Sequence, residues 1–432
     1  MGYALRDVLA NRHRRLRQAL VDRELDVLII TYLPNIFYLT NFGGSSAIVL
    51  LTRDSLYFIT DFRYLTAVES DWASPSGCPN ASLIRVDTTY DETLVSVLRS
   101  TGARCIGFEA ARVPFAQYGR WASGLGLAVP GATAAPAPRP EAQTGGGDDH
   151  RVKLVPTERF VEAERARKDA HEVTTLRQAA EMLTAAFGRI LAEVQPGRTE
   201  RQVGARIDWI MKDAGFDRSA FETIVASGPN GALPHARPGL RRLSTGDLVV
   251  LDFGGVYDGY CVDLARTVSL GEPDAEARRV YAAVVEAHGA GVAASRAGAT
   301  ARDIDRAVRG TLERLGLGEV FGHGTGHGLG IEVHEEPWLR RSRSPGPSRA
   351  GGPAEDRART ATPRDSTRNE EGAAASEPDG DTPVVIENGM VFTIEPGAYL
   401  PGWGGVRLED DLLVTPDGPE LLTHAPRELA VA

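Results

Sequence analysis

Two aspartates interrupt neighbouring apolar runs in residues 251–268, which read LDFGGVYDGYCVDLARTV. Asp258-Gly259 between these runs predicts a β-hairpin with a two-residue loop. In that register Asp252 and Asp263 point to one face as diagonal neighbours, with Cβ atoms within roughly 7–8 Å. Two ionised carboxylates in a core are costly unless they are protonated, paired or bound to metal. The hairpin by itself therefore indicates a possible metal site and raises the question of further ligands.

Three later clusters contain further candidate groups. The first is a glycine-rich track that carries histidines, and glycine lets backbone and substrate approach closely. The second is a glutamate that ends an apolar strand. The third is an arginine and a glutamate two residues apart, which the period of a strand places on one face. In chain order these residues are His323, His327, His334, Glu395, Arg407 and Glu409.

The candidate ligands are two aspartates, two glutamates and one histidine. Oxygen-rich ligation with one imidazole favours hard-to-borderline divalent ions, Mn²⁺ first, with Co²⁺ or Zn²⁺ as alternatives. Four carboxylates are more than one ion needs. Two ions roughly 3.5–4 Å apart, bridged by shared carboxylates, fit the set better.

The elements that position these residues follow from the helix signals around them. Helical periodicity predicts long helices over 170–194 and 199–214. Thr199 and Thr300 each lie two residues after a glycine and precede a helical pattern, so each is predicted to be an N-cap. The repeated order of long helix, capped second helix and strands favours a two-fold repeat within this part of the chain.

The first part of the chain has a different pattern. Apolar strand candidates alternate with helical stretches up to about residue 130, which predicts a compact α/β domain over 1–130. Residues 34–42 and 60–64 set polar residues among aromatics, and we interpret them as loop and packing features. The Ala/Pro-rich and Gly-rich residues 131–154 form a linker. The catalytic candidates then fall in a second domain, 155–432.

Residues 339–382 interrupt the second domain with almost no large apolar residue. Such a segment cannot bury enough surface to offset its ordering entropy, so it is predicted to be a disordered insertion.

Composition excludes several classes of protein. Hydrophobic residues make up 42% and charged residues 25%, as in globular proteins, and the net charge of −10 argues against a nucleic-acid partner. Three cysteines without paired spacing give neither a disulfide framework nor a zinc ribbon. No run approaches the ~20 apolar residues of a membrane span, and the N-terminus is not a secretion signal. We therefore expect a cytoplasmic protein without a membrane partner.

The order of these motifs resembles that of the metallopeptidase family of methionine aminopeptidase, aminopeptidase P and prolidase. Asp252 and Asp263 come first, followed by GHGTG, HEEP, FTIEP and RLED. The resemblance covers roughly residues 155–432. It implies an α+β pita-bread catalytic domain with an internal pseudo-two-fold, which agrees with the repeated helix caps. The α/β domain before it, with YLTNF and TDFRY, is similar to that of the proline-specific branch, Xaa-Pro aminopeptidase and Xaa-Pro dipeptidase.

The resemblance also implies metal roles for particular residues. Asp252 would hold one ion and His327 with Glu395 the other, while Asp263 and Glu409 would bridge the two.

The resemblance implies substrate roles as well. His235, in SGPNGALPH, matches a substrate-side histidine, and His334 matches the residue that stabilises the tetrahedral intermediate. His323 and Arg407 match residues that shape the substrate site. The implied catalytic residues are Glu395, His334 and His235, with Glu395 as proton shuttle to the leaving amine.

The activity implied is hydrolysis of the Xaa-Pro bond, at the N-terminus of proline-containing peptides or in Xaa-Pro dipeptides, by a hydroxide that bridges the metals. The resemblance also implies a homodimer. Two alternatives stay open: a metal-dependent hydrolase or lyase of another small substrate on the same fold, and a non-catalytic binding module. The complete ligand set argues against the second.

Overall fold

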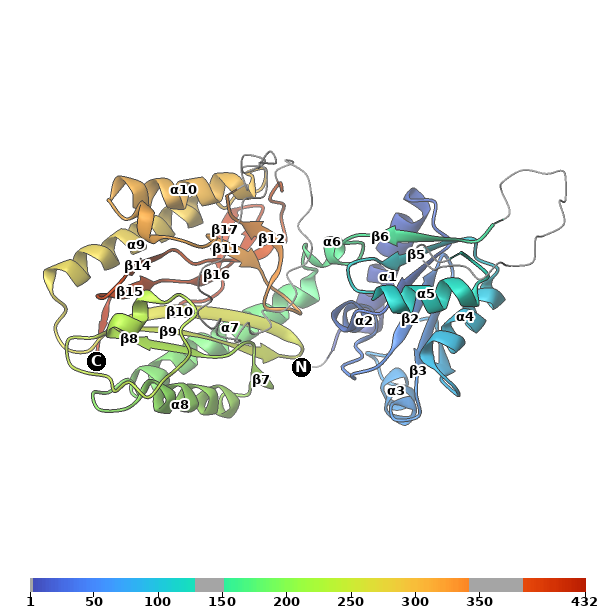
Figure 1. The fold of residues 1–432 in the computed structure, drawn as a ribbon, viewed down its shortest axis with the longest axis horizontal. Helices are drawn as coiled ribbons and strands as arrows, with labels where there is room; N and C mark the ends of the chain where they lie inside the picture. The colour runs from blue at the N-terminus through green and yellow to red at the C-terminus, as the bar shows by residue number, and fades with distance from the viewer. Residues whose placement is uncertain (1–2, 129–150, 342–383) are drawn as a thin grey trace, which may run out of the picture.

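The structure is a computed structural model that describes residues 3–128, 151–341 and 384–432. Most of the predicted linker 131–154 and nearly all of the predicted insertion 339–382 lie outside the described residues. Figure 1 shows two bodies, an N-terminal one in blue and a larger one in green to red, with α6 between them.

The N-terminal body is built on a mixed sheet with the strand order β4-β3-β2-β1-β5-β6. Strand β1 is apolar and buried at every position, because Leu28 and Ile30 enter one core while Val27 and Ile29 enter another. A sheet covered on both faces needs such a continuous apolar run. The strands are β1 (Val27–Ile30), β2 (Ile48–Thr52), β3 (Leu56–Thr60), β4 (Ala81–Arg85), β5 (Cys105–Glu109) and β6 (Lys153–Thr157). The helices are α1 (Arg6–Asp22), α2 (Leu33–Thr40), α3 (Leu65–Trp72), α4 (Tyr90–Thr101) and α5 (Phe115–Gly124).

Two features of this body differ from the sequence-based expectation. Residues 34–42, interpreted as loop and packing features, are mainly helix α2. Pro34 stands in its first turn, where proline is tolerated, and Asn41 ends it in the left-handed conformation with φ 61°. Strand β6 begins within the predicted linker 131–154 and pairs in parallel with β5, so the N-terminal sheet draws on residues beyond 150.

The larger body contains the predicted hairpin. Strands β9 (Leu248–Tyr257) and β10 (Tyr260–Ser269) pair antiparallel, with Tyr257 opposite Tyr260 and Asp263 opposite Gly254. Asp258 and Gly259 have φ 48° and 82°, the positive values that a type I′ loop requires. The predicted register is confirmed.

The remaining strands bring the later clusters to the hairpin. A second sheet has the order β12-β11-β13-β16-β17, and a bridge between Ala265 and Glu409 joins it to β10. The strands of this second sheet are β11 (Gly326–Gly328), β12 (Glu335–Leu339), β13 (Val391–Ile394), β16 (Asp410–Thr415) and β17 (Gly418–Leu421). A separate pair is β14 (Gly397–Leu400) and β15 (Gly404–Arg407), and β7 (Arg218–Ser219), β8 (Ile224–Ser227) and β18 (Ala430–Val431) flank the hairpin.

Two pairs of helices cover these strands from opposite sides (Figure 1). Helices α7 and α8 contribute to the core that holds the hairpin, and α9 and α10 contribute to a second core. Thr199 and Thr300 cap α8 and α10, each with a complete capping box, so both predicted caps are confirmed. The helices are α6 (Glu162–Arg165), α7 (Ala170–Leu191), α8 (Glu200–Asp213), α9 (Ala275–Ala294) and α10 (Ala301–Arg314), with short 3₁₀ turns η2 (Gly228–Ala232) and η3 (Gly318–Val320). Among the described residues, no helix combines the length and apolar character that a membrane crossing needs.

Candidate active site

A cavity of about 900 Å³ opens where the hairpin meets the second sheet. Its lining includes every residue that the sequence predicts for the site, namely His235, Asp252, Asp263, His323, His327, His334, Glu395, Arg407 and Glu409. Residues up to 174 positions apart, from His235 to Glu409, therefore meet around one space. The structure shows this placement, while the role of each residue remains a prediction.

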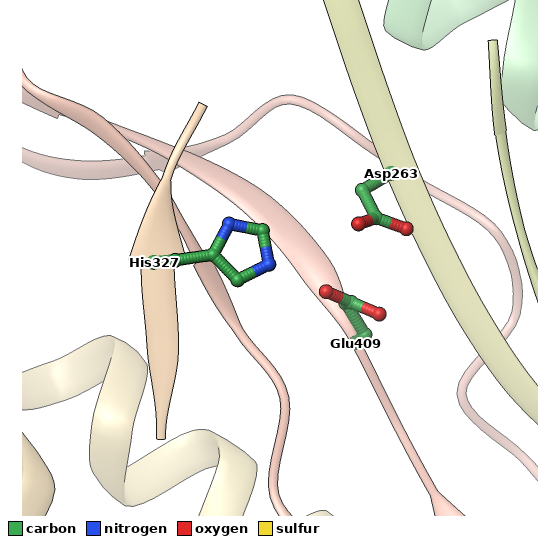
Figure 2. A group of neighbouring side chains, drawn as sticks. All are labelled: Asp263, His327 and Glu409. Atoms are coloured by element: carbon green, nitrogen blue, oxygen red, sulfur yellow. The ribbon is translucent and has the colours of Figure 1, made fainter. Parts of the chain in front are cut away.

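Three of the predicted metal ligands form a compact group. Ligand atoms of Asp263, His327 and Glu409 all lie within 4.8 Å of one another. Figure 2 shows the three side chains pointing toward a common space from three separate segments. All three are buried, with exposed fractions of 4%, 6% and 2%.

The hydrogen bonding of His327 leaves one ring nitrogen available. Its Nδ1 lies 3.1 Å from the carbonyl oxygen of Gly328, which can only accept a hydrogen bond. The proton therefore sits on Nδ1, and the lone pair of Nε2 is directed elsewhere. A backbone acceptor that fixes the tautomer in this way is a common feature of metal-binding histidines.

The carboxylates of the group carry an unbalanced negative charge. Burial raises the pKa of Asp263 well above its usual value, and the charges of Asp252, Asp411 and Glu395 raise it further. Burial and the charges of Asp263 and Glu395 do the same for the pKa of Glu409. Among the described residues, Oδ1 of Asp263 has no hydrogen-bond partner. Orphaned buried carboxylate oxygens beside an available imidazole nitrogen fit a divalent metal ion.

The other two predicted ligands lie beside this group. Oε1 of Glu395 is 3.8 Å from Nε2 of His327, and burial raises the pKa of Glu395 to about 7. Asp252 forms an ion pair with Nη1 of Arg407, while Oδ1 of Asp252 has no hydrogen-bond partner in the described part of the chain.

A hydrogen-bonded chain runs beside these carboxylates through two lining residues, His323 and Arg407. Nδ1 of His323 is 2.8 Å from the carbonyl of Gly324, so the hydroxyl of Tyr399 donates to Nε2 of His323, also at 2.8 Å. Nε of Arg407 donates to the same hydroxyl at 2.8 Å, and Nη2 donates to the carbonyl of Pro234, next to His235. Burial lowers the pKa of His323 to about 3, which keeps this imidazole neutral.

His334 belongs to a cluster of three rings with His327 and Trp338. Its ring centroid is 4.4 Å from that of His327 and 5.7 Å from that of Trp338, which stacks on it at 17°. His334 is itself exposed, so a molecule in the cavity can contact it.

Sequence reasoning missed three residues of the site. Tyr399 and Trp338 lie near predicted residues in the chain, and strand alternation could have suggested them. Asp411 accepts a hydrogen bond from the backbone N–H of Asp263 at 3.0 Å. Asp411 directly follows RLED and is the third of three consecutive acidic residues. The sequence did not indicate which of the three contacts the other site residues.

Comparisons with known proteins fit this geometry. Residues 174–416 match the model of metallopeptidase family M24, more than half of the chain. The chain belongs to metallopeptidase family M24. Residues 12–139 match the Creatinase/Prolidase N-terminal domain, so the predicted fold, an α/β domain followed by a pita-bread domain, is confirmed together with the family. Membership of this family makes the protein a metallopeptidase that uses divalent metal.

Similar proteins share nearly the full length of this M24 chain. The uncharacterized peptidase YqhT of Bacillus subtilis is 31% identical over 96% of this chain and 99% of its own. The structure of an Xaa-Pro dipeptidase from Bacillus anthracis has a TM-score of 0.79 at 31% identity, covering 98% of this chain and 100% of that one. An X-Pro aminopeptidase from Thermotoga maritima has a TM-score of 0.75 at 28% identity, with coverage of 97% and 100%.

Proposed function

We propose that this M24 metallopeptidase hydrolyses the Xaa-Pro bond, in dipeptides or at the N-terminus of longer peptides, with two divalent metal ions. The observation that carries the proposal is the meeting of all nine predicted site residues around one cavity. The names of its relatives, Xaa-Pro dipeptidase and X-Pro aminopeptidase, support the choice of substrate.

The metal ions would be held by the acidic side chains and one imidazole. Asp263 and Glu409 would be shared by the two ions, as the resemblance to the family implies, and both are buried beside further carboxylates. Asp252 would serve one ion, and His327 with Glu395 the other. When bound, the two ions would supply a water whose pKa is lowered from 15.7 toward about 7, so that hydroxide is available at neutral pH.

Two side chains of the site would act on the reacting atoms. His334 would donate a hydrogen bond to the oxygen that gains charge as the scissile carbonyl becomes tetrahedral. Glu395 would carry a proton to the leaving amine, a role that a carboxylate beside the reacting water can fill.

Proline as leaving group presents a tertiary amide without an N–H. The site therefore cannot select it through a hydrogen-bond acceptor and must select by shape. Arg407 donates a hydrogen bond to the carbonyl of Pro234, the residue before His235, and both His235 and Arg407 line the cavity. We assign these two side chains to the walls that receive the pyrrolidine ring.

The proposed activity is tested by supplying Mn²⁺ and assaying Ala-Pro, Ala-Pro-Gly and Ala-Gly, with a chelated sample as control. We expect cleavage of at least one proline substrate, little cleavage of Ala-Gly, and loss of activity on chelation. Failure to cleave either proline substrate, or cleavage that persists after complete metal removal, contradicts the proposal. The ratio of the two proline substrates separates a dipeptidase from an aminopeptidase.

We further propose Mn²⁺ as the working metal and a homodimer in the cytoplasm as the working form. The oxygen-rich ligand set supports Mn²⁺ over Co²⁺ or Zn²⁺. Light scattering behind gel filtration measures the mass of the particle, and a mass near the 46.4 kDa of one chain contradicts the dimer.

A further inference from the structure

A group of buried charged residues joins the two bodies directly behind His334. Its centre is Glu335, the next residue, whose side chain is 6% exposed. One carboxylate oxygen of Glu335 accepts from Nη2 of Arg165 and from the backbone N–H of Glu332 at 3.0 Å. The other oxygen accepts from Nζ of Lys168 at 3.1 Å. Three donors therefore hold both oxygens of one carboxylate.

The same arginine reaches into the N-terminal body. Nη1 of Arg165 donates to Oδ1 of Asn35 on α2 at 2.7 Å, and both side chains are buried. Nδ2 of Asn35 in turn donates to Glu109 of β5 at 2.7 Å. The hydroxyl of Tyr32 adds a second connection by donating to Glu332. Figure 1 shows α6, which ends at Arg165, between the two bodies.

The electrostatics keep Glu335 in its ionised form. Burial alone would raise its pKa, but the charges of Arg165 and Lys168 outweigh burial and lower the pKa to about 2. An ionised carboxylate bound by buried cations on both oxygens has little freedom to change rotamer.

Glu335 links this buried group of charged residues to the cavity, because it is the residue next to His334. His334 lies in the bend directly before β12 and lines the cavity, whereas Glu335, the first residue of β12, is buried in the protein. Fixing the side chain of Glu335 therefore fixes the backbone from which the imidazole of His334 extends.

We propose that Glu335 is a positioning residue for His334, and that the N-terminal domain helps to fix this histidine through Asn35 and Arg165. This inference rests on the proposed role of His334 in catalysis. A displacement of about 1 Å of a catalytic group can lower a rate by as much as 10²-fold.

A double-mutant cycle in the Mn²⁺-supplied full chain tests the first part. We expect Glu335→Gln to lower kcat for Ala-Pro roughly 10- to 100-fold with KM changed by about twofold or less. In a His334→Ala background, the same substitution should lower kcat by less than about threefold, because the residue through which it acts is absent. Equal losses in both backgrounds contradict positioning, because Glu335 would then act on the fold as a whole. Wild-type activity of His334→Ala alone contradicts the proposed role of that histidine.

Hydrogen exchange of the metal-free full chain tests the second part without an activity readout. We expect Asn35→Ala to speed exchange of residues 329–336 by about tenfold or more, since Arg165 loses an acceptor in the buried group. If this variant does not fold, Arg165→Lys replaces it, because lysine lacks the planar fork of donors.

The matched control is Arg15→Gln. Arg15 forms another contact between the bodies, with Glu164 at 2.6 Å. Among the described residues its side chain hydrogen-bonds to Glu164 and Tyr38 and to no residue of 332–336. In Arg15→Gln, the exchange rate of residues 329–336 should stay within about twofold of the wild-type rate. Unchanged exchange in Asn35→Ala, or an equal increase in Arg15→Gln, overturns the role of the N-terminal domain.

Discussion

The cavity and the joint between the two domains both contain buried carboxylates, but the two regions balance their charge in opposite ways. In the cavity, burial and neighbouring acids raise the pKa of Asp263 and Glu409. At the joint, Arg165 and Lys168 outweigh burial and lower the pKa of Glu335 to about 2. The carboxylates are buried in both regions, so the charges of their neighbours decide whether the pKa rises or falls. A joint whose charges are paired can hold a fold together, whereas a cavity with excess negative charge is suited to take up cations.

The largest expected difference between the regions concerns activity. Asp263→Asn removes a carboxylate proposed to contact both ions, so we expect kcat/KM for Ala-Pro to fall more than about 10³-fold, with loss of bound metal. The loss follows because the ions supply the reactive water. Steady-state assays together with elemental analysis measure both quantities. An active variant with normal metal content refutes the role of Asp263.

Stability of the metal-free protein should change in opposite directions in the two regions. We expect Glu335→Gln to lower the free energy of unfolding by about 3 kcal/mol, because it leaves buried cations without their partner. Asp263→Asn should raise it by about 1 kcal/mol or more, because it removes a repelling charge and its amide can donate to neighbouring carboxylates. Urea unfolding with chelator present gives both values. Changes of the same sign would mean that the two regions do not differ as described.

The pH dependence of the metal-free protein sharpens the contrast. The pKa of Glu395 is raised from 4.5 to about 7 by burial, so the folded chain binds this proton more tightly than the unfolded chain does. Its contribution to stability is therefore full below pH 4.5 and lost as the pH rises through 7. Glu395→Gln should be more stable than wild type by about 3 kcal/mol at pH 8, and the gap should vanish near pH 4. A gap that is independent of pH contradicts the raised pKa.

An exposed ion pair supplies the smallest effect. Arg177 of α7 and Glu420 of β17 pair at 2.7 Å with exposed fractions of 47% and 38%. Solvent screens such a pair, so we expect Glu420→Gln to change the free energy of unfolding by less than about 1 kcal/mol. A loss as large as that for Glu335→Gln would remove the distinction between buried and exposed pairs.

Local sequence signals predicted the parts of the site that depend on strand alternation and turn chemistry. Asp258-Gly259 fixed the hairpin loop, and with it the register that places Asp252 and Asp263 on one face. Thr199 and Thr300 marked the starts of α8 and α10. The residues brought to the cavity by long-range folding, such as His327 and Glu395, could be placed there only through the order of motifs that the family shares.

The remaining features depend on contacts that have no local signature. Arg165 and Glu335 are 170 positions apart and look like ordinary surface charges in the sequence. Strand β6 pairs with a sheet whose other strands precede the linker, and its own residues do not indicate which sheet it joins. Residues 34–42 set polar residues among aromatics and so suggest loop and packing features, although here Pro34 stands in the first turn of helix α2 and Asn41 ends it.

The central claim is that the unbalanced acidic cavity holds two divalent ions. Titration of the metal-free protein with Mn²⁺, followed by calorimetry and by elemental analysis after desalting, measures this directly. We expect two ions per chain in the wild type and fewer in Asp263→Asn, with activity on Ala-Pro rising only as the sites fill. A wild-type protein that binds no Mn²⁺ at this cavity, or an Asp263→Asn variant that binds both ions as tightly, would contradict the account.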